Sequence, residues 1–80
     1  MDDLEVVRRI NELADEEHRL RRAHAGSPLP ENDLQRLQAV EVALDQCWDL
    51  LRQRSARRDA GLDPDAASAR SEDTVEGYQQ

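Results

Sequence analysis

The feature that most constrains this chain is a stripe of large apolar side chains that repeats every seven residues between positions 31 and 60. Leu37, Leu44 and Leu51 mark the repeat, and other apolar side chains fill the positions between them. Seven residues make about two turns of an α-helix, so the stripe follows one side of that helix. No glycine or proline interrupts the range. The pattern predicts one long helix over residues 31–60 that needs an apolar partner.

A second apolar stripe precedes the first. Apolar residues recur at three- and four-residue spacing from Leu4 to Leu20, after two aspartates that are suited to a helix start. Gly26 and the following Ser-Pro-Leu-Pro segment end the pattern, because proline lacks a backbone donor and disfavours helix in the residue before it. The sequence therefore predicts a first helix over residues 2–25.

A connection this short favours an antiparallel hairpin. If facing residues have numbers that sum to about 57, every large residue on one stripe meets an apolar residue on the other, and acids at the start of the first helix lie beside arginines at the end of the second. The predicted pairs are Leu20–Leu37, Leu13–Leu44, Ile10–Cys47 and Val6–Leu51. The predicted fold is all-α, with a two-helix hairpin over residues 1–61.

Residues 62–80 form an acidic tail in this interpretation. Proline directly after Asp63 is typical of a helix start, so we expect a short helix near residues 64–69. The rest of the tail is small and charged, which predicts disorder. Its last six residues, VEGYQQ, contain Val75 and Tyr78, which are expected either to anchor the tail on the hairpin or to form a peptide motif for a partner. Both interpretations stay open.

Composition and charge limit the partners and the cellular location that we expect for this protein. The formal net charge of −7 argues against a nucleic-acid partner, since phosphate contacts need a basic surface. The chain has no apolar run long enough to cross a membrane and begins with acidic residues, so we expect a cytoplasmic protein without a membrane span or secretory signal. The single cysteine, Cys47, is expected to be a small buried apolar residue.

Two helices alone bury only one stripe each, so apolar side chains outside the seam would stay in contact with water. The sequence therefore predicts a homodimer in which two hairpins form a four-helix bundle. The alternative is that the tail folds back over the same surface within one chain. Tryptophan and tyrosine are enriched at the energetic centres of interfaces. The expected interface residues are Val42, Trp48, Leu50 and Tyr78; the alternative for Trp48 is a core position within a single hairpin.

Carboxylates and a histidine gather in the middle of the first helix. Asp15 and His18 have the three-residue spacing of ligands in di-metal helical bundles. We expect a solvated acidic stretch paired with neighbouring arginines, and no metal or cofactor; a metal-binding bundle is the alternative. Its further carboxylates would be Glu16, Glu17, Glu41 and Asp45.

Catalysis is not expected. No serine has a base in a suitable position, Cys47 lies on the apolar stripe, and the three glycines are isolated rather than gathered in a phosphate loop. We therefore expect a protein interaction module with an unidentified protein partner, and no catalytic residue. The alternative is a regulator that contacts RNA or the transcription or translation machinery through arginines at the end of the second helix: Arg52, Arg54, Arg57 and Arg58.

Four stretches of the chain resemble a family of small actinobacterial proteins that is catalogued as a domain of unknown function. The resemblance covers nearly the whole chain and implies a cytoplasmic actinobacterial protein with a C-terminal motif of its own. It implies no activity. The stretches are RINELADEEHRLRR (9–22), LDQCWDLLRQRSARR (44–58), AGLDPDAA (60–67) and VEGYQQ (75–80).

Overall fold

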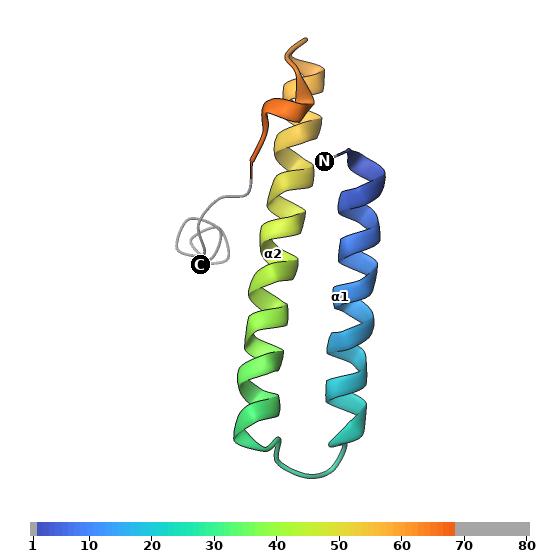
Figure 1. The fold of residues 1–80 in the computed structure, drawn as a ribbon, viewed down its shortest axis with the longest axis vertical. Helices are drawn as coiled ribbons and strands as arrows, with labels where there is room; N and C mark the ends of the chain where they lie inside the picture. The colour runs from blue at the N-terminus through green and yellow to red at the C-terminus, as the bar shows by residue number, and fades with distance from the viewer. Residues whose placement is uncertain (1, 69–80) are drawn as a thin grey trace.

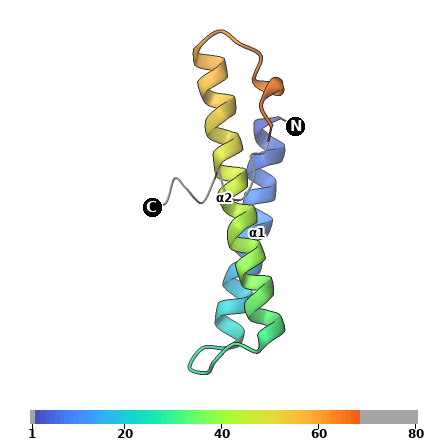
Figure 2. The ribbon, with the colours of Figure 1, turned by 90° about the vertical axis from the view of Figure 1, so that its left-hand side faces the viewer.

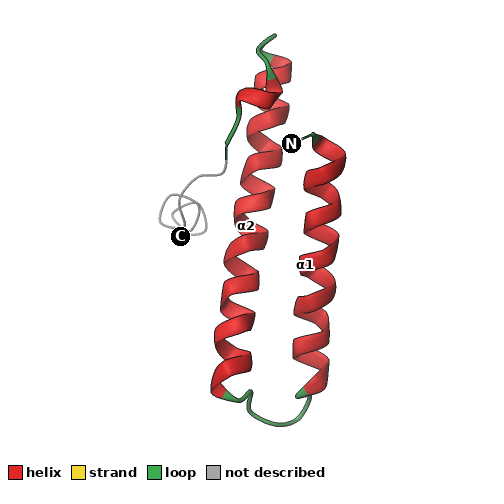
Figure 3. Cartoon of the chain, in the orientation of Figure 1, coloured by secondary structure: helices red, strands yellow, loops and turns green. Residues whose placement is uncertain are grey.

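The computed structural model describes residues 2–68, and every regular element in this range is helical. Helix α1 spans Asp3–Ala23, helix α2 spans Glu31–Asp59, and a single 3₁₀ turn, η1, spans Pro64–Ala66. Figures 1 and 3 show α1 and α2 side by side and antiparallel, with the connecting loop at one end. The predicted all-α hairpin is confirmed, and both long helices end within two residues of the predicted bounds.

Polar contacts between the two helices reveal the register of the hairpin. Arg54 Nε donates to Asp3 Oδ1 at 2.5 Å near one end, and His24 Nε2 lies 2.6 Å from Asp33 Oδ2 near the other. In both pairs the residue numbers sum to 57, as the sequence predicts. The seam therefore keeps one register over the length of α1.

The core is thin and aliphatic. Its buried members are distributed over both helices: Val6, Ile10 and Leu13 from α1, and Leu37, Val40 and Leu50 from α2. Three of them, Val6, Ile10 and Leu50, form a cluster against which the half-buried Leu44, Cys47 and Leu51 also pack. Burial of a few such side chains contributes only several kcal/mol, so each contact in this core has a large share in the stability.

The ends of the helices follow from local chemistry. Asp2 caps α1, because its Oδ1 accepts a hydrogen bond from the amide of Glu5 at 2.8 Å. Past the end of α2, Gly61 adopts a positive φ of 75°, and the amides of Gly61 and Leu62 donate back to the carbonyls of Arg58 and Arg57. This is the Schellman arrangement, which reverses the chain direction at a residue without a Cβ.

After that reversal the chain runs back along α2 as a segment that we call the return segment, residues 62–68. Figure 2 shows it descending from the end of α2 toward the start of α1. Ala67 packs against the core cluster, and Gln53 Nε2 donates to the carbonyl of Ser68 at 2.8 Å. Part of the tail thus covers the hairpin. The predicted disorder further on, and the roles of Val75 and Tyr78, lie outside the described residues.

No helix in the described range is both long and apolar enough to span a membrane.

Candidate functional site

Two ion pairs identify the two sides of the hairpin. Arg21 Nη2 lies 2.6 Å from Glu41 Oε1 on one side, and Arg36 Nη2 donates to Glu16 Oε1 at 2.7 Å on the other. A step of seven residues returns to within about 20° of the same direction around a helix. Residues seven or fourteen positions from each pair therefore share its side of the molecule.

The side with the Arg21–Glu41 pair carries apolar side chains that no other segment of residues 2–68 covers, and we call it the open face. On α1, seven-residue steps from Arg21 lead to Ala14 and Val7; on α2, steps from Glu41 lead to Leu34 and Trp48. Val7, Leu34 and Trp48 are 39%, 40% and 46% exposed. They are three of the five large apolar side chains that the described chain exposes, so the exposed apolar surface concentrates on this face.

The opposite side is closed by the chain itself. Seven-residue steps from Arg36 along α2 lead to Ala43, Leu50 and Arg57. Leu50 is buried in the cluster against which Ala67 packs, and Arg57 Nε donates to the carbonyl of Asp63 at 2.6 Å. The return segment therefore covers this row of side chains and leaves the Trp48 row exposed.

The predicted interface residues consequently lie in different places. Trp48 is on the open face, next to the half-buried Leu44 and Leu51. Leu50 is only 9% exposed and belongs to the core of a single hairpin. Val42 is half-buried and, being six residues from Trp48, points about 120° away from it around α2. Tyr78 lies outside the described residues. Of the three described residues, only Trp48 lies on the open face, so a single interface through that face would not include Val42 or Leu50.

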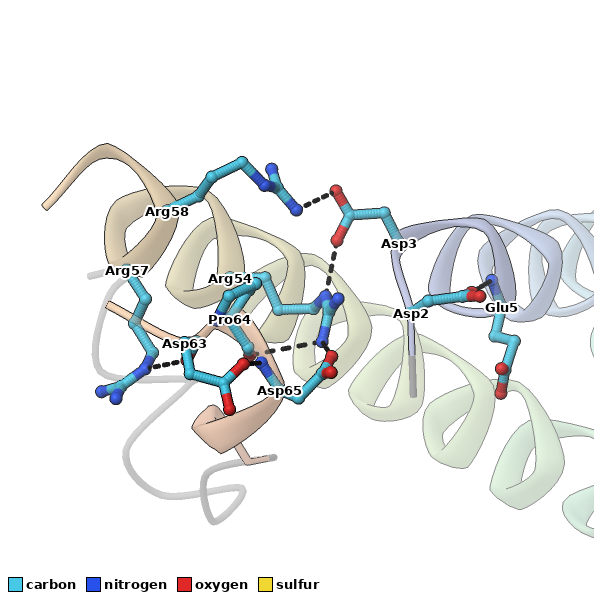
Figure 4. A network of polar contacts seen from close by, with 9 residues as sticks. All are labelled: Asp2, Asp3, Glu5, Arg54, Arg57, Arg58, Asp63, Pro64 and Asp65. Atoms are coloured by element: carbon cyan, nitrogen blue, oxygen red, sulfur yellow. Dashed lines mark hydrogen bonds and ion pairs between the residues drawn. The ribbon is translucent and has the colours of Figure 1, made fainter. Parts of the chain in front are cut away.

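A network of polar contacts fastens the return segment to both helices (Figure 4). Its centre is Arg54, a guanidinium on α2 that is only 4% exposed. Besides its bond to Asp3, Arg54 Nη1 donates to Asp65 Oδ1 at 2.9 Å and to the carbonyl of Pro64 at 3.2 Å. Arg58 Nη2 donates to the second oxygen of Asp3 at 2.7 Å. One planar cation thus joins the start of α1, the end of α2 and η1.

This network determines what the predicted arginine cluster can offer to an RNA or protein surface. Arg54, Arg57 and Arg58 all donate to groups of the same chain. Arg52 is exposed and has no hydrogen bond or ion pair within residues 2–68. Three of the four guanidinium groups are therefore already engaged, which leaves a small basic surface for phosphate.

Two members of the acidic stretch of α1 pair with arginines, one on the same helix as the sequence predicts and one on α2, which the sequence does not predict. Glu16 accepts from Arg36, and Glu17 lies 4.0 Å from Arg21. Asp15 and His18 are exposed. Within the part of the chain that the structure describes, no three histidine, cysteine or carboxylate side chains gather closely enough to hold a metal ion.

Burial raises the pKa of the Cys47 thiol, and the positive charge of Arg9 opposes this only in part. A raised pKa leaves less thiolate at neutral pH, and thiolate is the nucleophilic form. Cys47 packs against the core cluster but is half-buried rather than fully buried as the sequence predicts.

The ion pairs predict a loss of stability in acid. Hydrogen bonds from Arg54 and then Arg58 lower the pKa of Asp3, and the hydrogen bond from Arg36 lowers the pKa of Glu16. A carboxyl whose pKa is lower in the folded state stabilises the fold above its unfolded pKa, and this contribution is lost as the pH falls through the folded pKa. We expect the urea midpoint to be level near neutral pH and to fall from about pH 5 downward.

The double variant Asp3→Asn, Glu16→Gln checks the source of this dependence. It is expected to be less stable than the wild type at pH 7 and to lose less stability on acidification, so that the two pH curves converge. Parallel curves would contradict the assignment to these two carboxyls.

Two features escape a reading of the sequence. Arg54 and Asp49 are both buried, although charged residues on an amphipathic helix are normally expected in solvent. Neither residue belongs to the seven-residue apolar repeat, so the sequence pattern does not predict that they are buried. For Arg54 the register of 57 indicates the pairing with Asp3, and the Asp-Pro-Asp sequence at 63–65 supplies a further carboxylate and a carbonyl after the chain reversal.

The fold and these surfaces define a small helical-hairpin protein, clasped at one end by arginine contacts and apolar on one side. The chain belongs to the family described as "Protein of unknown function (DUF2630)", whose model matches residues 2–80. The resemblance drawn from the four sequence stretches is thereby confirmed.

Similar chains occur in mycobacteria. Uncharacterized proteins of Mycobacterium tuberculosis and Mycobacterium bovis are each 46% identical to this chain over 77 residues, which is 95% of this chain and 88% of theirs. No solved structure matches the chain.

Proposed function

We propose that this protein is a non-enzymatic, cytoplasmic interaction module that self-associates through its open face. The observation that carries the proposal is the exposure of Trp48, an indole ring that is 46% exposed beside the half-buried Leu44 and Leu51. Tryptophan at such a position is a frequent centre of binding energy. The single cysteine, which cannot form an intramolecular disulfide, is in keeping with a reducing compartment.

The position of the return segment also favours the open face, rather than the opposite side of the hairpin, as the interface. The return segment already packs over the Leu50 row, so that apolar surface is shielded within one chain. The row of Trp48 has no such cover within residues 2–68. An association that buries Trp48 removes from water the largest apolar side chain that residues 2–68 expose, with a gain of about 25 cal/mol per Å² of apolar surface.

Sedimentation velocity of the purified chain over about 1 to 100 µM tests the proposal. We expect the average sedimentation coefficient to rise with concentration. Trp48 is the only tryptophan, so its emission should move to shorter wavelength over the same range. A monomer throughout, with unchanged emission, would refute self-association.

Trp48→Ala is expected to raise the dissociation constant by about 30-fold or more, because truncation of an interface tryptophan commonly costs at least 2 kcal/mol. Val42→Ala is the matched control, since Val42 is an apolar residue of the same helix that points away from the open face. Its dissociation constant should stay near that of the wild type. Equal effects of the two variants would contradict the open face as the interface.

A further inference from the structure

Trp48 is flanked on the open face by two charges of opposite sign. Asp45 precedes it by three residues and Arg52 follows it by four, so both lie on its side of α2. Neither has a hydrogen bond or ion pair with another residue of the range 2–68. Most other charges near the seam do have a partner, such as Glu41 with Arg21.

From this arrangement we infer how two copies dock, and the inference rests on the proposed self-association. The α2 helices of two copies pack antiparallel along the open face, with a two-fold axis at Trp48. Asp45 of each copy then pairs with Arg52 of the other.

The spacing makes this geometry self-complementary. In an antiparallel pair of helices related by a two-fold axis near position 48, facing residues have numbers that sum to about 97, and 45 and 52 satisfy this condition. The two charges are seven residues apart, or about 10.5 Å along the helix, so each lies about 5 Å from the axis. Symmetry creates the same ion pair twice, and both flank the two tryptophans.

Repulsion between like charges also disfavours a parallel arrangement of the two α2 helices. A parallel pair of α2 helices would set Asp45 beside Asp45 and Arg52 beside Arg52, which are like charges. Each copy carries a net charge of −7, so association has to overcome a general repulsion. Two local pairs of opposite charge therefore act on the orientation of the dimer as well as on its affinity.

The apolar part of the face agrees with this arrangement. Leu44 and Leu51 are the half-buried neighbours of Trp48 on the two sides of the axis. On α1, Val7 lies nearly level with Trp48, since their numbers sum to 55 in a hairpin with a register of 57. Leu44, Leu51 and Trp48 thus form an apolar strip along the face, and the two ion pairs lie beside this strip close to the axis.

Charge reversal tests the inference by sedimentation. Asp45→Arg and Arg52→Asp are each expected to raise the dissociation constant by about 10- to 30-fold, because each change turns two attractive pairs into two repulsive ones. The two variants shift the net charge in opposite directions, so a common weakening cannot come from net charge. A mixture of the two single variants, and the double variant alone, should both regain the wild-type affinity within about threefold.

Asp15→Arg and Arg8→Asp are the matched controls. These residues are also seven apart, are exposed, and lie on the side of α1 away from α2. They should change the dissociation constant by less than about threefold. Circular dichroism verifies that every variant keeps its helix content.

The outcomes separate the two proposals. A wild type that dimerises, with reversals at 45 and 52 that behave like the controls or do not rescue one another, overturns the antiparallel geometry and leaves self-association intact. A wild type that stays monomeric overturns both.

Discussion

Leu13→Ala is expected to lower the free energy of unfolding by about 2 to 4 kcal/mol, the usual cost of removing a buried leucine side chain. Leu13 is 2% exposed in the seam between α1 and α2. Because the core has six buried aliphatic residues, few neighbours can move to fill the cavity. A domain of this size has about 4 to 12 kcal/mol in total, so a substantial part of the stability is lost.

Urea denaturation followed by circular dichroism at one fixed protein concentration measures this loss. Leu4→Ala is the control, since Leu4 is a leucine of the same helix that is 65% exposed. It should cost less than about 1 kcal/mol. A loss at Leu13 as small as the loss at Leu4 would show that the seam does not hold the hairpin together.

Arg54→Ala is expected to release the return segment. The change removes the bonds to Asp3, Asp65 and the Pro64 carbonyl at once, together with the buried stem of the side chain. The amides of Ala66 and Ala67, which donate to the carbonyls of Asp63 and Pro64, should then exchange with solvent about tenfold faster or more. The melting temperature should fall as well.

Hydrogen exchange read by NMR at these amides distinguishes a local release from general destabilisation. Arg58→Ala removes a single bond to Asp3 and should have a smaller effect. Arg54→Lys keeps the charge but not the planar fork, so we expect an intermediate effect. Unchanged exchange in Arg54→Ala would mean that the packing of Ala67 and the bonds from Gln53 and Arg57 hold the segment without Arg54.

Much of the fold could be predicted because it depends on local and periodic signals. The seven-residue spacing of Leu37, Leu44 and Leu51 defines the buried side of α2, and its match to α1 specifies the register. The reversal at Gly61 follows from the need for a positive φ after the helix. The partner of Arg54 at the start of α1 follows from the same register.

The candidate site could be predicted only in part. Trp48 stands out by residue type alone, and it is on the exposed surface. Leu50 looks equally available in the sequence, since both residues lie beside the main stripe. The difference between them arises from residues more than ten positions further along the chain, which pack on one of the two sides.

The sequence by itself determined the helices, their caps, the hairpin register and the pairing of Arg54 with Asp3, because each depends on spacing along the chain. Only the tertiary structure decided which side stays open. That choice depends on the direction in which the return segment leaves Gly61 and on the three groups that meet the fork of Arg54. Contacts of this kind join distant segments through side-chain geometry, which no periodic pattern encodes.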